Sequence, residues 1–236
     1  MNNSMRRGLK VLPTMPAPQR VMVVALVLLV AQLILRSWAA WFGWYAGDDL
    51  IFLRWADRSA DPGYLFESYN GHLMPGGKLV FGLIGLAGSS AWWPAVVFLV
   101  VAQAVASLSF LWLLVTLFGR RWSIVPPFAL YLFSPLAIPT YMWFVESTQQ
   151  LPYQIALGLG LGSWVRYLRG EGRRWLIATA AVFVIGLFFR EKVLLVLPVL
   201  LFVQLFYFTS GNLKSRVADL RTAAPGLATM LGLSVA

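Results

Sequence analysis

The stretch WPAVVFLVVAQAVASLSFLWLLVTLF, residues 93–118, decides the fold class. It contains no charged side chain and exceeds the length of about 20 apolar residues that a helix needs to cross a bilayer. The whole chain agrees with it: 59% of its residues are hydrophobic, 12% are charged and the mean hydropathy is +0.73. Soluble domains carry roughly 25% charged residues. The sequence therefore predicts an all-α, polytopic transmembrane helix bundle, and it excludes a cytosolic enzyme, a disordered chain and, since cysteine is absent, a disulfide scaffold.

Comparable apolar runs along the chain predict six to seven membrane spans. The runs are residues 21–35, 93–118, 124–144, 152–164, 175–189, 193–208 and a last one from about residue 223. Residues 1–20 form a polar, basic tail before the first span. We expect residues 21–236 to form one transmembrane domain that is incomplete at its C-terminus, because the last apolar run has no charged flank.

The longest polar stretch follows the first span and forms a predicted loop over residues 44–92. It holds five of the 9 acidic residues of the chain. Connections of this length are usually functional. Within it, the apolar run Leu79–Ala87 is too short to cross a bilayer, so residues 78–88 are predicted to form a helix that lies in the membrane interface.

The distribution of charge predicts the orientation of the chain. With this topology, 13 of the 19 lysines and arginines but only two acids fall on one side of the membrane. The side that is rich in basic loops is normally the cytoplasmic one. The N-terminus is therefore predicted to be cytoplasmic and the acidic loop extracytoplasmic, and the net charge of +10 is assigned to orientation rather than to nucleic-acid binding.

Asp48 and Asp49 are the first candidates for chemistry. They open an apolar segment, where a single aspartate would serve as a helix N-cap. Two adjacent carboxylates repel each other unless a cation neutralises them, and one of them then has a raised pKa. The pair is thus either a cap or a general base that also binds a divalent cation.

Further polar residues come from the same loop and from the first span. His72 is the only histidine of the chain, and its side chain suits contacts with protons and phosphates. Glu67 is either a solvated loop acid or a supporting group. Arg36, near the end of the first span, is expected to extend its guanidinium to the interface.

Two polar turns between later spans complete the candidate set. Arg190-Glu191-Lys192 is either a self-neutralising turn or a site where the cations hold a phosphate and Glu191 orients it. Glu146, with Gln149 and Gln150, is either a buried hydrogen-bonded patch or a wall of the site.

The order of these parts resembles the GT-C superfamily of polytopic glycosyltransferases. The likeness covers about residues 20–210 and rests on the acid pair after the first span, on NGHLMPGGKLVFGLI at residues 70–84 and on FREKVLLVLP at residues 189–198. Among bacterial members, the protein mannosyltransferases and the aminoarabinose transferases are the most similar in this region. Family members usually have more spans and often a soluble C-terminal domain.

The resemblance implies that a sugar passes from a polyprenyl-phosphate donor to a hydroxyl of a glycan, lipid or protein acceptor. Transfer would occur on the outer side of a bacterial cytoplasmic membrane. It gives the role of base, or of ligand for Mg²⁺, Mn²⁺ or Ca²⁺, to Asp48 and Asp49. Arg190-Glu191 resembles the Lys–Glu element of the family, which would put a cation near the donor phosphate, and His72 matches a polar loop position. From the residues themselves, we add Lys192 as a second cation for the phosphate and Glu146 and Glu67 as supporting acids.

Two other functions fit the composition. A transporter or flippase for a lipid-linked or small solute would carry polar residues continuously through the bilayer. A non-catalytic membrane subunit would dock a partner on its long loop. The enzyme alone requires the acids of the first loop and the cations of the turn at residues 190–192 to face one cavity.

Overall fold

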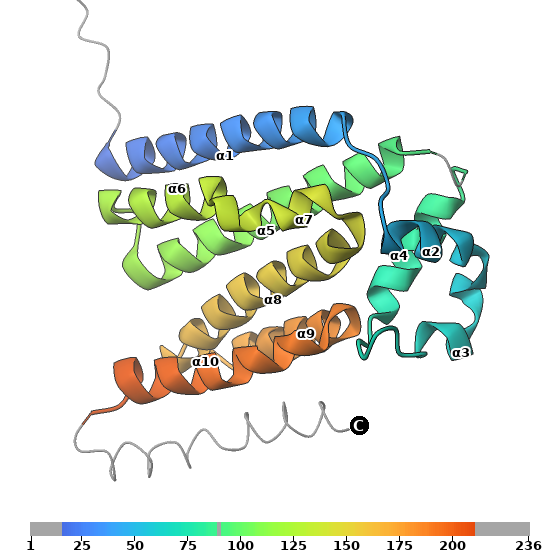
Figure 1. Cartoon of the computed structure of the whole chain (residues 1–236). Coiled ribbons are helices and arrows are strands. Elements are labelled where there is room, and N and C mark those ends of the chain that lie inside the picture. The colour runs from blue at the N-terminus through green and yellow to red at the C-terminus, as the bar shows by residue number, and fades with distance from the viewer. Residues whose placement is uncertain (1–15, 89–90, 211–236) are drawn as a thin grey trace, which may run out of the picture.

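The chain folds as a bundle of helices in a computed structural model that describes residues 16–88 and 91–210 (Figure 1). The α-helices are α1 (Ala17–Trp41), α2 (Asp48–Arg54), α3 (Pro62–Leu65), α4 (Pro75–Gly85), α5 (Trp93–Phe118), α6 (Val125–Phe133), α7 (Pro139–Met142), α8 (Phe144–Leu168), α9 (Arg174–Phe189) and α10 (Val196–Val203). Short helical turns are η1 (Ala56–Ala60), η2 (Trp122–Ile124), η3 (Pro135–Ala137), η4 (Glu191–Leu195) and η5 (Gln204–Phe208). The described residues form no β-sheet, so the predicted all-helical class is confirmed.

Three helical segments are long and apolar enough to cross a membrane: α1, α5 and the continuous stretch Glu191–Phe208. A fourth is gained if the pair Trp122–Phe133 and Pro135–Met142 is one span. The sequence predicts an unbroken run there, but the two halves meet at an angle of 41°. Pro135 lies at this break, and proline cannot continue the hydrogen-bond ladder of a helix. The predicted seventh span and most of the tail lie outside the described residues.

The long helices run back and forth along one direction, and α2, α3 and α4 form a small cap at one end (Figure 1). α8 packs between α5 and α9, while α1 lies against α5 and α6. At the capped end of the bundle, α1 and α9 end and α5 and α8 begin. Segments that are far apart in the sequence therefore meet there. The helix at Pro75–Gly85 stands where a short interfacial helix is predicted, and proline at its first position suits a helix start.

Helices α5 and α8 approach closely because α8 presents glycines to its neighbour. A Cβ atom built on Gly158 would lie 2.9 Å from the backbone carbon of Ser109 on α5. One turn later, Gly162 faces the ring of Trp112 on the same helix. Small residues spaced by four allow two helix backbones to meet inside a membrane, where packing rather than the hydrophobic effect drives association.

Gly158→Ala is expected to lower the stability of the protein by about 1–3 kcal/mol, the usual cost of overpacking. Gly160→Ala is the matched control, since its Cβ would meet only Val182, at 4.0 Å, and alanine favours a helix. Thermal unfolding of the detergent-purified protein measures both changes. Equal unfolding temperatures for the two variants would contradict the close contact with α5.

An aromatic cluster joins the capped end to the bundle. Phe144, the first residue of α8, is 1% exposed, and four rings surround it with centroid separations of 5.2–6.1 Å. These rings belong to Tyr45, Phe81, Trp92 and Phe98. Edge-to-face ring pairs add to the stabilisation that burial provides. These ring contacts fix the start of α8 against α4 and the neighbouring aromatic residues.

Candidate functional site

A cavity of about 250 Å³ lies at the capped end of the bundle. Its lining consists of Asp48, Tyr69, Asn70, His72, Met74, Trp143, Val145, Glu146, Gln149 and Arg190. Four of the predicted site residues are therefore brought together, namely Asp48, His72, Glu146 and Arg190, and Gln149 lines the cavity as well. These four residues come from the start of α2, the loop before α4, the first turn of α8 and the junction after α9. The enzyme hypothesis requires an acid of the first loop and a cation of residues 190–192 to face one cavity. Asp48 and Arg190 are more than 140 positions apart in the sequence, and they line the same cavity.

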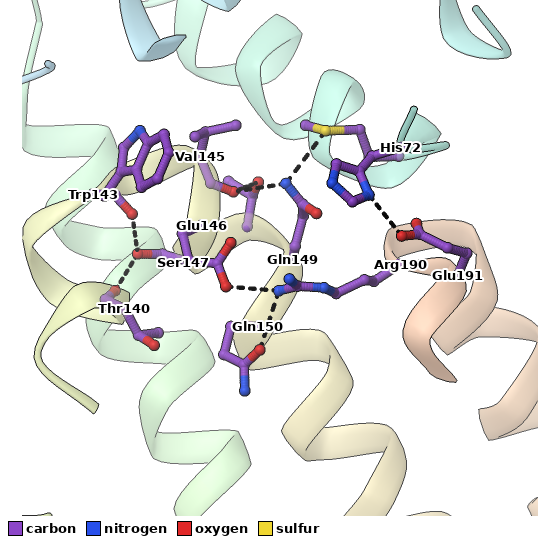
Figure 2. A network of polar contacts seen from close by, with 12 residues as sticks. His72, Thr140, Trp143, Val145, Glu146, Ser147, Gln149, Gln150, Arg190 and Glu191 are labelled. Carbon is purple, nitrogen blue, oxygen red and sulfur yellow. Dashed lines mark hydrogen bonds and ion pairs between the residues drawn. The ribbon is translucent and has the colours of Figure 1, made fainter. Parts of the chain in front are cut away.

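Arg190 is held in the wall of this cavity by two hydrogen bonds. It has an extended backbone (φ −160°) between α9 and η4, which turns its side chain toward α8. Its Nη1 donates to Oε1 of Glu146 at 2.7 Å and to Oε1 of Gln150 at 3.1 Å (Figure 2). The residue is 6% exposed, and its Nε has no hydrogen-bond partner in the described part of the chain. A buried guanidinium with an unused donor is well suited to bind an anion.

His72 is presented by a tight turn. Asn70 and Gly71 have positive φ angles of 50° and 81°, and Tyr69 and His72 exchange two backbone hydrogen bonds across them. Asn-Gly is the preferred pair for such a turn, and it is the signal in the sequence that could have located it. Nδ1 of His72 lies 2.7 Å from Oε1 of Glu191, which links the turn to η4 (Figure 2).

Asp49 does not share the environment of Asp48. It is fully buried, and its carboxylate accepts backbone hydrogen bonds from Val145 at 2.7 Å, Phe144 at 3.4 Å and Ala46 at 3.1 Å. Burial raises the pKa of Asp49, and these hydrogen bonds oppose the increase. Asp49 thus caps the first turn of α8 from a distance. The N-cap expected for the segment that the pair opens is not formed by either aspartate, because Gly47 is the N-cap of α2 and no side chain caps it.

Asp49→Ala is expected to lower the free energy of unfolding by about 2–4 kcal/mol, because two buried N–H groups of α8 lose their acceptor. Asp57→Ala is the matched control, since Asp57 is an exposed acid of the same loop. Chemical denaturation in detergent, followed by circular dichroism, compares them. A change no larger than that of the control would show that the cap does not stabilise α8.

Asp48 is partly exposed and lines the cavity. Burial, followed by the charge of Asp48 and a hydrogen bond to it, raises the pKa of Tyr69, which also lines the cavity. Because Asp49 is engaged with backbone donors, Asp48 is the member of the pair whose carboxylate can reach a ligand. Together with Glu146 it places two carboxylates and one guanidinium on the cavity surface.

Four predicted site residues do not line the cavity: Asp49, which is buried against backbone donors, and Lys192, Glu67 and Glu191. Lys192 and Glu67 are exposed, and Glu191 reaches the site only through His72. A residue that the sequence analysis did not single out is Lys78 on α4. It is 2% exposed, its Nζ donates at 2.6 Å to the backbone carbonyls of Tyr64 and Glu67, and burial lowers its pKa. A single lysine in an apolar helix indicates that its ammonium group has buried hydrogen-bond partners. Here the bonds of Lys78 hold residues 64–67, the segment that leads into the turn of His72, against α4.

The donor set of the site does not match a protein-held metal ion. Within residues 16–88 and 91–210, no group of three or more His, Asp or Glu side chains is placed to bind one. The oxygens of Asp49 face backbone donors, and Glu146 is paired with Arg190. We therefore assign no step of the chemistry to the divalent cation that the sequence resemblance implies.

Comparison of the chain with protein-family models, with curated proteins and with solved structures finds no match in any of the three. What the site does must be argued from its own geometry and charge.

Proposed function

We propose that the protein is an integral membrane glycosyltransferase that moves a sugar from a polyprenyl-phosphate donor to an acceptor hydroxyl on the extracytoplasmic side. The observation that carries the proposal is the shared cavity of Asp48 and Arg190. One supplies a carboxylate able to take a proton, and the other a guanidinium able to hold a phosphate. The acceptor is a glycan, a lipid or a protein, and nucleic acid has no part in the function.

The proposed setting is the bacterial cytoplasmic membrane, with six or seven spans and a cytoplasmic N-terminus. The three apolar helices of membrane-crossing length support a membrane location. The loops before α6 and α9, together with the adjoining ends of α8 and α9, carry six arginines: Arg120, Arg121, Arg166, Arg169, Arg173 and Arg174. Both loops lie at the end of the bundle opposite the cap, which is the distribution of basic residues expected for a cytoplasmic face (Figure 1).

The reaction we propose is a single displacement at the anomeric carbon. The carboxylate of Asp48 takes the proton of the acceptor hydroxyl, and the acceptor oxygen forms a bond to that carbon. The bond between the anomeric carbon and the phosphate oxygen breaks, and its electron pair leaves on the polyprenyl phosphate. Positive charge develops on the sugar ring in the transition state, as it does in glycoside hydrolysis. Because attack and departure occur on opposite faces, the anomeric configuration is inverted.

Arg190 is the group placed to stabilise the departing phosphate. A cation fixed in advance acts on developing negative charge without having to reorganise during the reaction. Glu146 and Gln150 hold the guanidinium at the cavity wall through its Nη1, and its Nε is buried without a hydrogen-bond partner in the described residues. His72 contributes a ring nitrogen to the same cavity and is itself positioned by Glu191.

Release of polyprenyl phosphate tests the proposal directly. The full chain is reconstituted in liposomes with a panel of undecaprenyl-phosphate sugars and bacterial membrane extract as the source of acceptors. We expect one sugar of the panel to be consumed with equal production of undecaprenyl phosphate, measured by mass spectrometry, and nucleotide sugars to be inert. Movement of intact donor between leaflets without release of undecaprenyl phosphate would instead identify a flippase and overturn the proposal.

A further inference from the structure

A second, larger cavity of about 420 Å³ lies on the other side of α8 from the candidate site. Glu146 and Gln149 of α8 line the site, whereas Gln150 and Gln154 line the second cavity. Gln150 also accepts the hydrogen bond from Arg190, so this contact separates the two spaces. The remaining wall of the second cavity comes from α1, α5 and the bent segment of α6 and α7.

Arg36 is the one charged residue among the described residues that line this cavity. Its Nη2 donates to the backbone carbonyl of Leu132 at 3.0 Å, and its guanidinium lies 3.5 Å from the ring centroid of Tyr141. No acidic side chain in the described part of the chain forms an ion pair with it. It stands five residues before the end of α1, about 7.5 Å along the helix axis. An unpaired cation at this depth is costly and commonly marks the position of an anionic ligand.

The other polar groups of the cavity are neutral hydrogen-bonding side chains. They are Gln103, Tyr131, Ser134, Thr140, Tyr141, Gln150 and Gln154. Tyr131, Tyr141 and Gln103 donate to neighbouring side chains. The amide nitrogens of Gln150 and Gln154 are not used in these contacts, and amide donors beside one guanidinium match a phosphate, which offers several acceptor oxygens to one cation. A carboxylate ligand would use fewer of them.

The surroundings of the cavity favour a phosphate that belongs to a lipid. Two residues of its rim, Leu130 and Leu136, are 73% and 88% exposed on the surface that faces the bilayer in our assignment. Tyr141 separates the cavity from an apolar one of about 670 Å³ lined by Trp38, Trp44 and other aromatic residues. A polar chamber beside an apolar chamber, both reached from the bilayer, matches a molecule with a charged head and hydrocarbon chains.

We propose that the Arg36 cavity binds the phosphate headgroup of a membrane lipid, at a site separate from the one that contains Arg190. The site is independent of the transfer chemistry, and its occupant is a phospholipid of the surrounding bilayer that enters past Leu130 and Leu136.

Photolabelling of the full chain in phosphatidylcholine nanodiscs tests this inference. The probe is phosphatidic acid with a diazirine near its headgroup, and the readout is the labelling of peptides that cover residues 130–142. Arg36→Met is expected to reduce this labelling at least about tenfold, the effect of losing one charge-assisted contact. Arg36→Lys should retain part of it, and Arg120→Met, an exposed arginine at the other end of α5, should leave it unchanged. Leu136→Glu, at the exposed rim, should also abolish labelling without disturbing the interior.

Equal labelling in Arg36→Met, or equal labelling by a diazirine diacylglycerol that lacks the phosphate, would overturn the inference. Inorganic phosphate is added as a competitor in a titration. If it displaces the lipid probe completely, the site binds free phosphate, and the lipid assignment is overturned. Asp48→Asn is expected to keep the labelling whether or not it abolishes transfer, so a failure here is distinguishable from a failure of the proposed function.

Discussion

Asp48→Asn is expected to reduce sugar transfer by at least about a hundredfold, the usual loss when a general base is removed. The amide keeps the size of the side chain but cannot take the proton of the acceptor hydroxyl at neutral pH. The fold should be unaffected, because Asp48 is partly exposed and the cap on α8 belongs to Asp49. Release of undecaprenyl phosphate from the reconstituted protein measures the loss, and the unfolding temperature confirms that the variant is folded.

Asp57→Asn is the control for Asp48→Asn, since it removes an exposed acid of the same loop outside the cavity. It should transfer sugar at the rate of the unaltered protein. Near-normal turnover in Asp48→Asn would remove the base from the proposed mechanism. Loss of turnover together with a fall in unfolding temperature like that expected of Asp49→Ala would assign Asp48 a structural role instead.

Arg190→Met is expected to lower kcat by about a hundredfold or more, because removing one donor from a developing anion typically has an effect of this size. Arg190→Lys keeps the charge but not the planar fork, so it should recover part of the rate. The main change should appear in kcat rather than in KM, since the phosphate gains negative charge as the sugar leaves. Initial rates over a range of donor concentrations separate the two constants.

Lys192→Met is the matched control for the change at Arg190. The resemblance assigns both cations to the donor phosphate, but Lys192 is exposed and does not line the cavity. Its replacement should change kcat by less than about threefold, as expected for an exposed charge outside the site. If Lys192→Met were as damaging as Arg190→Met, the donor phosphate would bind outside the cavity described here.

The sequence predicts two of the long helices well, but it is wrong about the turn expected at residues 146–150, because α8 runs unbroken from Phe144 to Leu168. The span expected at residues 93–118 coincides with α5, and the run that ends at Phe189 ends where α9 does. The bend between α6 and α7 is missed, because apolar residues lie on both sides of Ser134 and Pro135 and make the run look continuous. Composition thus locates helices but carries little information about how one of them is interrupted.

The candidate site is only partly predictable, for a different physical reason. Charged residues in a chain this apolar are few, so Asp48, Glu146 and Arg190 can be selected as candidates by their rarity. Their partners cannot be, because the pairing of Arg190 with Glu146 depends on how α8 and α9 are aligned in three dimensions. The different roles of Asp48 and Asp49 likewise depend on the N–H groups of α8, which are 95 and 96 residues away.

The hydrogen bond between Asp49 and the backbone of Val145 also fixes the distance between two carboxylates of the cavity. Each end of it is adjacent in the chain to a cavity carboxylate: Asp48 precedes Asp49, and Glu146 follows Val145. The spacing of these carboxylates is therefore set by the main chain and a single short tether, whatever side chains surround them. Substitutions in the hairpin of Tyr69 and His72, which lines the same space, would then change the shape of the cavity while the separation of the charged groups stays constant.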